Sequence, residues 1–225
     1  VAVKVRHPSV GKILSRDLRI LRIFCGFLSR IPQYKWMNLD HNIVNFARNM
    51  NAQVDLTFEA QNLRQFIENF KDIENVKFPE PIQWNSNVLI EEYMDMKCIK
   101  EYIGYPDEHM RKTLAELGVF IFLKMLVRDN FIHGDLHVGN IFVTFLPVDS
   151  KKGEVQPCYV LLDAGLVNRL TPQNRSTFLQ LFSAFVVDDA ETVAACLLDE
   201  NFRNVYLHYK DKLDPSKIVQ MRDFT

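Results

Sequence analysis

The segment His133-Gly-Asp135-Leu-His-Val-Gly-Asn140 decides the fold assignment. It places an Asp five residues before an Asn, on a predicted loop that leads into an apolar run at residues 141–145. Phosphoryl transfer needs a carboxylate that orients the attacking hydroxyl and oxygen ligands that hold magnesium on the phosphates. The spacing therefore predicts Asp135 as the catalytic carboxylate and Asn140 as a magnesium ligand. Because short motifs also arise by chance, other elements must agree with it.

Three further residues occur in the order that a kinase site requires. Asp163 follows the second strand of a predicted hairpin, where a kinase places a magnesium-binding Asp. Lys4 lies in Val-Ala-Val-Lys, close to the Val-Ala-Ile-Lys strand whose lysine holds the α- and β-phosphates. Glu59, on a later helix, is the candidate ion-pair partner of Lys4. Taken singly, Lys4 is typical of an ordinary strand lysine and Glu59 of a solvated helix charge, but the ordered set indicates a kinase-like site.

The two histidines of the decisive segment have other interpretations. His133 and His137 are spaced as a metal-binding pair can be, but no His-Glu-x-x-His motif accompanies them, which disfavours zinc. We expect His133 to brace the loop by hydrogen bonding. His137 is equally consistent with a phosphate contact and with packing.

Hydrophobic periodicity predicts a mixture of strands and helices, and with the ordered kinase residues it indicates an α+β, protein-kinase-like bilobal fold. Compared with a kinase, the small first lobe is partly β, lacks its first strands and carries a helical insert, and the second lobe is helical with a hairpin at the catalytic loop. The second long helix is expected to be interrupted near residues 49–51 and to turn Phe58, Leu63, Phe66 and Phe70 toward the core. The predicted strands are 1–5, 87–94, 141–145 and 159–162, and the predicted helices are 9–31, 40–70, 107–130 and 171–209.

Two domains are predicted from this order. Residues 1–94 form a partial first lobe with the lysine strand, the inserted helix, the Glu59 helix and a hinge strand, and residues 95–225 form the second lobe. The chain begins without methionine inside a strand and ends without a stop signal, so we interpret it as an internal fragment, truncated at its C-terminus as well.

Composition restricts the partners and the compartment. The formal net charge is −1, which gives no electrostatic reason to expect nucleic acid. The four cysteines show no Cys-x-x-Cys pair, which is typical of free thiols in a reducing compartment. The longest apolar run, 117–127, contains Lys124 and is too short to span a bilayer. The basic face near Arg22 is consistent with a solvated surface, a phosphate site or a membrane surface.

Three departures from an ordinary protein kinase bear on the substrate. Gly134 stands where Arg normally precedes the catalytic Asp and receives the activation-loop phosphate, and Ala164 replaces the Phe of Asp-Phe-Gly. Residues 166–170 pass almost directly into a helix at Thr171-Pro172, which leaves no activation segment on which a peptide substrate could dock. The sequence thus favours a small-molecule or lipid substrate, or ATP hydrolysis coupled to another process.

Longer motifs resemble the UbiB/ADCK (aarF-domain) atypical kinases over essentially the whole chain. They include Val1-Ala-Val-Lys-Val-Arg-His-Pro-Ser-Val10, Gln53-Val-Asp-Leu-Thr-Phe-Glu-Ala-Gln-Asn62 and Leu162-Asp-Ala-Gly-Leu-Val167. Glu59-Ala-Gln-Asn-Leu63 and Val76-Lys-Phe-Pro79 look most like a mitochondrial member.

The resemblance implies a Mg²⁺-dependent ATPase or kinase at the mitochondrial inner membrane that supports coenzyme Q biosynthesis or lipid metabolism. Its partners would be ATP, a quinone-precursor or lipid ligand, and the membrane or a coenzyme Q biosynthetic complex. By motif match, Lys4 and Glu59 form the ion pair, and Asn140 and Asp163 hold magnesium. The hinge residues that face adenine would be Glu92, Tyr93 and Met94.

One family element is altered and others are missing from this sequence. The family carries a Glu-x-Asp element that helps to close the site against protein substrates, and here it reads Gln53-Val-Asp55. The Ala-rich nucleotide loop and the Lys-x-Gly-Gln helix would precede Val1, so we expect the isolated chain to bind ATP poorly.

Two alternatives to an atypical ATPase or kinase remain. Aminoglycoside and choline kinases share a His-Gly-Asp-Leu-His-x-Gly-Asn loop, although the long insert between Lys4 and Glu59 and the Asp-Ala-Gly sequence speak against them. The other alternative is a nucleotide-gated scaffold of a membrane biosynthetic complex with little catalysis of its own.

Overall fold

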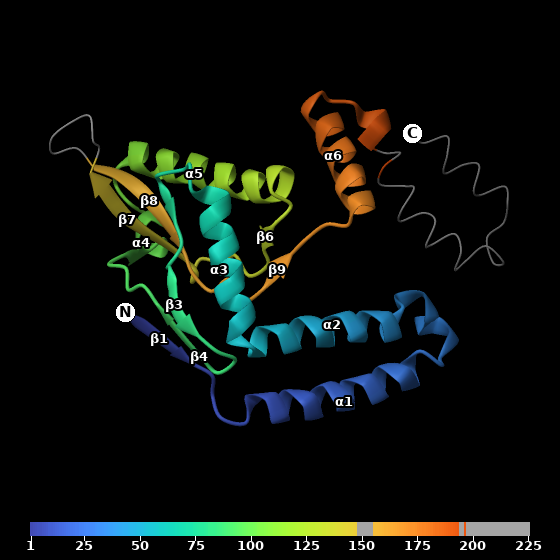
Figure 1. Cartoon of the computed structure of the whole chain (residues 1–225). Helices are drawn as coiled ribbons and strands as arrows, with labels where there is room; N and C mark the ends of the chain where they lie inside the picture. The colour runs from blue at the N-terminus through green and yellow to red at the C-terminus, as the bar shows by residue number, and fades with distance from the viewer. Residues whose placement is uncertain (148–154, 194–195, 197–225) are drawn as a thin grey trace. The chain divides into compact units, whose positions relative to one another are not determined.

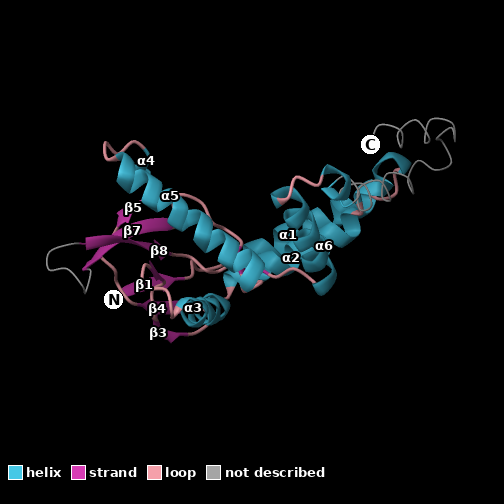
Figure 2. Cartoon of the chain, turned by 90° about the horizontal axis from the view of Figure 1, so that it is seen from above, coloured by secondary structure: helices cyan, strands magenta, loops and turns pink. Residues whose placement is uncertain are grey.

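The computed structural model describes residues 1–147, 155–193 and 196 of the chain. Helices and short sheets alternate along it, so the predicted α+β, kinase-like class is confirmed. Figure 1 shows the elements in chain order, and Figure 2 separates helix from strand in a view from above. Among the described residues no helix has the length and apolar character needed to cross a membrane.

The first sheet carries the candidate lysine. It has three strands in the order β1-β4-β3, and both pairings are antiparallel. Lys4 of β1 pairs with Leu89 of β4, whose side chain is fully buried. The bounds are β1 Ala2–Val5, β3 Pro81–Trp84 and β4 Val88–Glu91.

The second sheet contains the predicted hairpin. β7 and β8 pair antiparallel from Ile141↔Leu161 to Pro147↔Val155, and the sheet has the order β2-β8-β7-β5. The tip of this hairpin, residues 148–154, lies outside the described residues. A separate two-stranded pair, β6 with β9, flanks the decisive segment. The bounds are β2 Val76–Lys77, β5 Lys97–Cys98, β6 Ile132–His133, β7 Ile141–Pro147, β8 Val155–Leu161 and β9 Val167–Asn168.

The helices that border the sheets are α3 and α5. Helix α3 contacts β2, β3 and β4, whereas α5 contacts β8, and the two are separated by the sheets in the view from above (Figure 2). The helix bounds are α1 Val10–Leu28, η1 Pro32–Met37, α2 Leu39–Val54, α3 Leu56–Phe70, α4 Lys100–Ile103, α5 Glu108–Leu123, the π-helical η2 Lys124–Arg128 and α6 Pro172–Val186.

Several bounds differ from the sequence prediction. The helix predicted over 171–209 ends at Val186 in α6, and part of its predicted range lies outside the described residues. Three further differences concern α3 and the hinge strand. The break in the second long helix falls at Asp55 and not near residues 49–51, because the Asp55 side chain accepts a hydrogen bond from the Thr57 N–H and caps a new helix. Phe58 is 47% exposed, whereas its predicted partners on the core face are buried. The hinge strand is shorter than predicted and ends at Glu91.

The contacts divide the chain into two units. One comprises Val1–Leu21 and Val44–Arg169, and the other comprises Arg22–Ile43 and Leu170–Thr225. All predicted site residues belong to the first unit. The predicted division at residues 94/95 falls inside that unit and stays a prediction.

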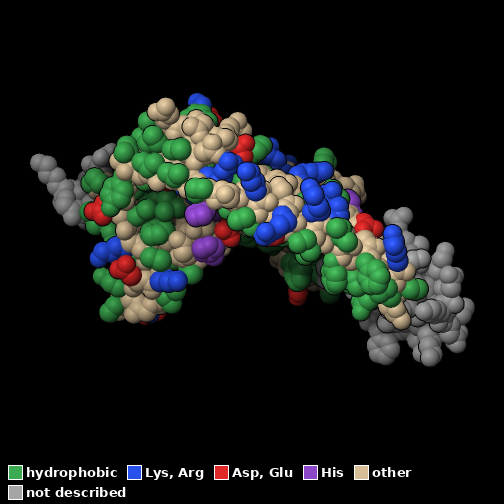
Figure 3. Space-filling view, turned by 90° about the horizontal axis from the view of Figure 1, so that it is seen from below, with side chains coloured by type: hydrophobic (Ala, Val, Ile, Leu, Met, Phe, Trp, Pro, Cys, Tyr) green, Lys and Arg blue, Asp and Glu red, His purple; other side chains and the backbone are tan. Residues whose placement is uncertain are grey.

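Basic side chains gather on the face seen in Figure 3. In the first unit, Arg6, Lys12, Arg16 and Arg19 line an open hollow of about 580 Å³ together with two serines. Lys12, Arg16 and Arg19 are exposed, as expected for the outer face of α1.

The core of the first unit forms around Phe66 of α3. Its ring has no solvent exposure and stacks on Phe78, with centroids 4.9 Å apart. It also packs against Phe131 at 4.6 Å and against the imidazole of His133 at 6.0 Å. One side chain therefore joins α3 to the start of the decisive segment.

Truncation of Phe66 tests this role. We expect Phe66→Ala to lower the free energy of unfolding by about 3–5 kcal/mol, because it removes a fully buried ring and leaves a cavity. Thermal or urea unfolding measures the effect. Phe58→Ala on the same helix is the control, and equal losses in the two variants would contradict the assignment of the core.

Candidate active site

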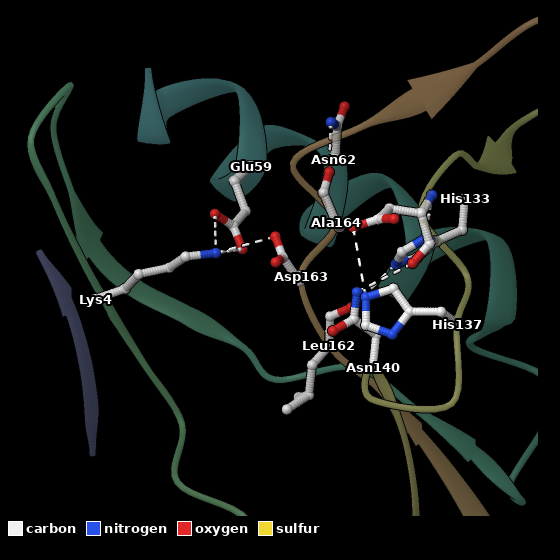
Figure 4. A network of polar contacts seen from close by, with 10 residues as sticks. Lys4, Glu59, Asn62, His133, His137, Asn140, Leu162, Asp163 and Ala164 are labelled. Carbon is white, nitrogen blue, oxygen red and sulfur yellow. Dashed lines mark hydrogen bonds and ion pairs between the residues drawn. The ribbon is translucent and has the colours of Figure 1, made fainter. Parts of the chain in front are cut away.

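Lys4, Glu59 and Asp163 meet at one point, although they come from β1, α3 and the loop after β8. The Lys4 Nζ lies 2.8 Å from each carboxylate oxygen of Glu59 and 3.0 Å from Oδ1 of Asp163. Figure 4 shows the lysine reaching across to both acids. Glu59 and Asp163 lie 55 and 159 positions after Lys4 in the chain, so the fold brings distant residues together. The sequence predicted the pair of Lys4 with Glu59 but not the contact of Lys4 with Asp163.

Electrostatics keep this cluster ionic. Burial acts to lower the pKa of Lys4, but the carboxylates of Glu59 and Asp163 outweigh it, and the net pKa is raised. Burial raises the pKa of Glu59, whose side chain is 5% exposed, and the ammonium of Lys4 opposes that rise. Since Lys4 stays charged at neutral pH, the pair with Glu59 is an ion pair.

Two contacts in the N-terminal half of α3 fix the position of Glu59. Asp55, the surviving residue of the altered Gln53-Val-Asp55 element, is the N-cap of α3. One turn after Glu59, the Asn62 Nδ2 donates a 2.8 Å hydrogen bond to the carbonyl of Ala164 (Figure 4). Asn62 thus ties the ion-pair helix to the Asp163-Ala-Gly165 turn.

The backbone at Asp163 adopts an unusual conformation. Its φ of 58° lies in the left-handed region, which non-glycine residues rarely occupy outside turns and functional sites. The hydrogen bond from Asn62 to the next residue and the contact with Lys4 hold the turn in this shape. Its carboxylate faces the ammonium of Lys4 as a result.

His133 braces the decisive segment, as predicted. The side chain is buried, its Nε2–H donates to the carbonyl of Leu162 at 3.0 Å, and its Nδ1 accepts from the Asp135 N–H at 3.2 Å. Burial lowers the pKa of His133, which keeps the ring neutral and its Nδ1 free to accept. Both ring nitrogens are occupied, so this histidine cannot also bind zinc.

Hydrogen bonds within the segment and to the strand after it fix the positions of Asp135 and Asn140. The Asn140 Nδ2 donates to the backbone carbonyl of Asp135 at 3.0 Å, and the Leu162 N–H donates to the carbonyl of Asn140. The carboxylate of Asp135 is about half exposed and lies 3.8 Å from the His137 ring. His137 is itself exposed, and its Nδ1 accepts from the Gly139 N–H, so it shapes the loop.

Asn140 and Asp163 offer suitable ligands for a magnesium ion. The amide nitrogen of Asn140 donates to the Asp135 carbonyl, which leaves the amide oxygen as the atom that can bind a metal. Of the two Asp163 oxygens, Oδ1 accepts from Lys4, while Oδ2 has no hydrogen bond or ion pair among the described residues. Mg²⁺ prefers one or two such oxygens together with substrate phosphates, so the donor set fits that ion.

The predicted hinge residues lie directly after β4. Glu92 and Tyr93 are exposed, and Met94 is partly buried. The Glu92 N–H donates to the carbonyl of Glu80 at 2.9 Å. Within the described chain the Met94 N–H has no hydrogen-bond partner, and so it can donate to a ligand edge. A base at this hinge would be held by backbone groups more than by the side chains of Glu92 and Tyr93.

Gly134 is required by a close approach of two segments. Its N–H donates to the carbonyl of Leu166, and a Cβ at this position would lie 2.7 Å from Cγ of Leu166 and 2.8 Å from the Asn168 side chain. The Arg that ordinary protein kinases carry here has no room in this structure.

Adding one methyl group tests this contact. We expect Gly134→Ala to destabilise the protein by about 1–3 kcal/mol through overpacking against Leu166. Differential scanning fluorimetry measures the shift. Gly104→Ala is the matched control, because a Cβ there meets nothing within 4 Å. If the two variants melt at the same temperature, Gly134 is not constrained by packing.

Glu91, the last residue of β4, is an acid that the sequence analysis did not single out. It is partly buried, and its carboxyl makes no hydrogen bond or ion pair in the part of the chain that the structure describes. Burial raises its pKa to about 7, the negative charge of Glu59 adds to the rise, and Lys4 opposes it. The only sequence signal was its place two residues after Leu89, and so on the same face, in a predicted strand.

Protein stability should report this shift. A carboxyl whose folded pKa exceeds the unfolded value of 4.5 stabilises the fold fully below pH 4.5, and that contribution is lost as pH rises through about 7. Glu91→Gln removes the titration, so we expect it to melt about 2 °C or more above the wild type at pH 8 and at the same temperature at pH 4.5. The exposed Glu92→Gln is the control; a pH-independent offset in the Glu91 variant would contradict the prediction.

Comparison with known proteins places this geometry in a family. The family profile described as the ABC1 atypical kinase-like domain matches residues 1–197. The mitochondrial ABC1 family protein C21C3.03 of Schizosaccharomyces pombe is 33% identical over 82% of this chain and 32% of its own length. A probable protein kinase UbiB of Azotobacter vinelandii is 30% identical over 90% of this chain and 37% of its own length. The chain therefore spans about a third of the length of these relatives.

A solved structure agrees at the level of the fold. The complex of Rv3197 with erythromycin from Mycobacterium tuberculosis superposes with a TM-score of 0.65 at 19% identity, over 87% of this chain and 47% of the other. The two proteins thus share a fold, although their sequences are only 19% identical.

Proposed function

The chain belongs to the ABC1 (UbiB/ADCK) atypical kinase-like family, and from this premise we propose that it binds Mg-ATP and transfers or hydrolyses the terminal phosphoryl group. The observation that carries the proposal is the Lys4 ammonium held between Glu59 and Asp163 beside the Asp135–Asn140 loop. Family members that match this chain are named as probable protein kinases, which agrees with a phosphotransferase.

Each residue has a role that follows from its chemistry. Lys4, fixed by Glu59, would bind the α- and β-phosphates, and Asn140 with Asp163 would hold magnesium. The metal ion supplies charge neutralisation on the phosphates when it is bound. Asp135, on a loop braced by His133, would orient the attacking hydroxyl or water and accept its proton.

The acceptor is proposed to be a small molecule, a lipid or water. Only three residues separate the end of β9 at Asn168 from the start of α6 at Pro172. A peptide substrate would need a longer segment there to dock against. A quinone precursor or lipid fits the resemblance to proteins of quinone and lipid metabolism.

Named relatives support the proposed cellular setting. The relatives of Schizosaccharomyces pombe and Saccharomyces cerevisiae are both named mitochondrial ABC1 family proteins. We extend that location to this chain and place it at the inner membrane, in support of coenzyme Q biosynthesis or lipid metabolism. Erythromycin is a ligand of the mycobacterial protein and is not carried over.

Two carboxylate variants test the proposal in the full-length protein that contains this domain. Asp163→Asn should weaken Mg²⁺-dependent ATP binding by at least about tenfold, because it removes a charged metal ligand. Asp135→Asn should leave ATP binding within about threefold but lower turnover by about 100-fold or more. Calorimetric binding with and without Mg²⁺, and phosphate release, give the two readouts.

The control is Asp72→Asn, an exposed acid at the end of α3 outside the site. Absence of Mg²⁺-dependent nucleotide binding in the wild type would overturn the proposal. If binding is intact but the Asp135 and Asp163 variants rescue a null cell fully, the nucleotide-gated scaffold replaces the enzyme. Phosphorylation of choline or an aminoglycoside by the wild type would instead indicate a soluble small-molecule kinase.

A further inference from the structure

Glu91 lies on the inner face of the first sheet, the face that carries Lys4. In the antiparallel pairing of β1 with β4, Lys4 lies opposite Leu89 and Ala2 lies opposite Glu91. Residues opposite each other, and residues two apart on one strand, project from the same side of a sheet. Leu89 is fully buried on that side, so the Glu91 side chain points inward as well.

Along β4, Glu91 lies between Leu89, which pairs with Lys4, and the hinge. It is two residues, or about 7 Å, further along the strand than the partner of Lys4. The next residues, Glu92 to Met94, form the hinge. A nucleotide with its phosphates at Lys4 and its base at the hinge would pass beside the Glu91 carboxyl.

The charged groups that face Glu91 come from three elements. They are Lys4 of β1, Glu59 of α3 and Asp163 after β8, while β3, with the sequence Pro81-Ile-Gln-Trp84, contributes no titratable group. The nitrogen of Lys4 is already shared by the two other acids. Glu91 is therefore a half-buried carboxyl whose hydrogen-bonding capacity is not met by the described protein, and a ligand group can meet it.

We propose that Glu91 is a specificity-determining residue of the nucleotide site and that its carboxyl contacts the substituent at position 6 of the purine. The inference rests on the proposed binding of ATP. A carboxylate accepts hydrogen bonds only, so it favours a 6-amino group, which donates, over a 6-keto group, which does not. A protonated carboxyl can also donate, and it therefore tolerates either group.

The pKa of Glu91 near 7 makes this discrimination depend on pH. Above pH 7 the ionised carboxylate should reject a 6-keto purine, and below pH 7 the neutral acid should accept it. A glutamine at this position presents both a donor and an acceptor at every pH. Selection between the two nucleotides should then be weak and independent of pH.

The test compares ATP with ITP, which carries a keto group at position 6. Dissociation constants are measured at pH 6 and pH 8 with saturating Mg²⁺, using the full-length wild type, Glu91→Gln and the control Glu74→Gln, an exposed acid outside the site. The ratio of the two constants cancels the titration of the phosphates, because both nucleotides share it. We expect the wild type and the Glu74 variant to prefer ATP by about tenfold at pH 8 and by less than about threefold at pH 6. The Glu91 variant should stay below about threefold at both values.

The outcomes separate this inference from the function on which it rests. If the wild type binds neither nucleotide, the proposed function fails. If the wild type binds ATP but its ratio of constants equals that of Glu91→Gln at both pH values, the specificity role of Glu91 is overturned. A pH-dependent ratio that the Glu91 variant retains would assign the discrimination to another group and would also overturn it.

Discussion

The ion pair between the Lys4 ammonium and the Glu59 carboxylate holds β1 against α3, and the candidate site depends on it. No short-range sequence pattern brings Lys4 next to Glu59, since the two residues are 55 positions apart. Helix α3 is fixed independently of the pair. Asp55 caps its N-terminus, Phe66 packs in the core, and the buried Lys124 donates to the carbonyl of Asn69 in its last turn. Glu59 is thus presented by a rigid support.

The Lys4–Glu59 ion pair contributes more to the function of the site than to the stability of the fold. Removing two charges from water costs free energy that their mutual attraction does not always return. Around a single ammonium the fold gathers three carboxyl groups, those of Glu59, Glu91 and Asp163. The excess negative charge favours a cation near Asp163. Burial raises the pKa of Glu91, and the same excess charge adds to that rise. A site of this composition is arranged to bind a cation and its phosphate ligand.

Sequence predicted those parts of the fold and site that depend on local spacing. The loop from His133 to Asn140, the hairpin after it and the place of Asp163 are all encoded within about 30 residues, and the structure has them in that order. The apolar run Val88-Leu-Ile90 also predicted the β4 strand, although the predicted end, Met94, lies three residues beyond the observed one. Lys4 and Glu59 were predicted as partners only because the other elements were already in order.

The features that were missed depend on contacts that no local pattern records. The helical period continues on both sides of Asp55, so only its hydrogen bond to the Thr57 N–H shows that it is a cap. Strand β2 has two residues, and its partner β8 lies some 80 positions later, which leaves no signal in either segment. The role of Asn62 can be recognised only in the folded structure, where its Nδ2 lies 2.8 Å from the Ala164 carbonyl.

Among the described residues after Asp163, β9 leads into α6 without an activation segment, and this changes which part of the protein can control Asp163. In this structure the turn at Asp163 is clamped on one side by Asn62 of α3 and on the other by the close approach of Gly134 to Leu166. The Gly134 contact is tight and leaves no room for adjustment, whereas Asn62 is carried by the same helix as Glu59. A displacement of α3 would therefore move the partner of Lys4 and release the Asp163 turn together. A ligand or partner that controls this site is thus expected to act through α3. On that helix Glu59 holds Lys4 and Asn62, one turn later, holds the Asp163 turn.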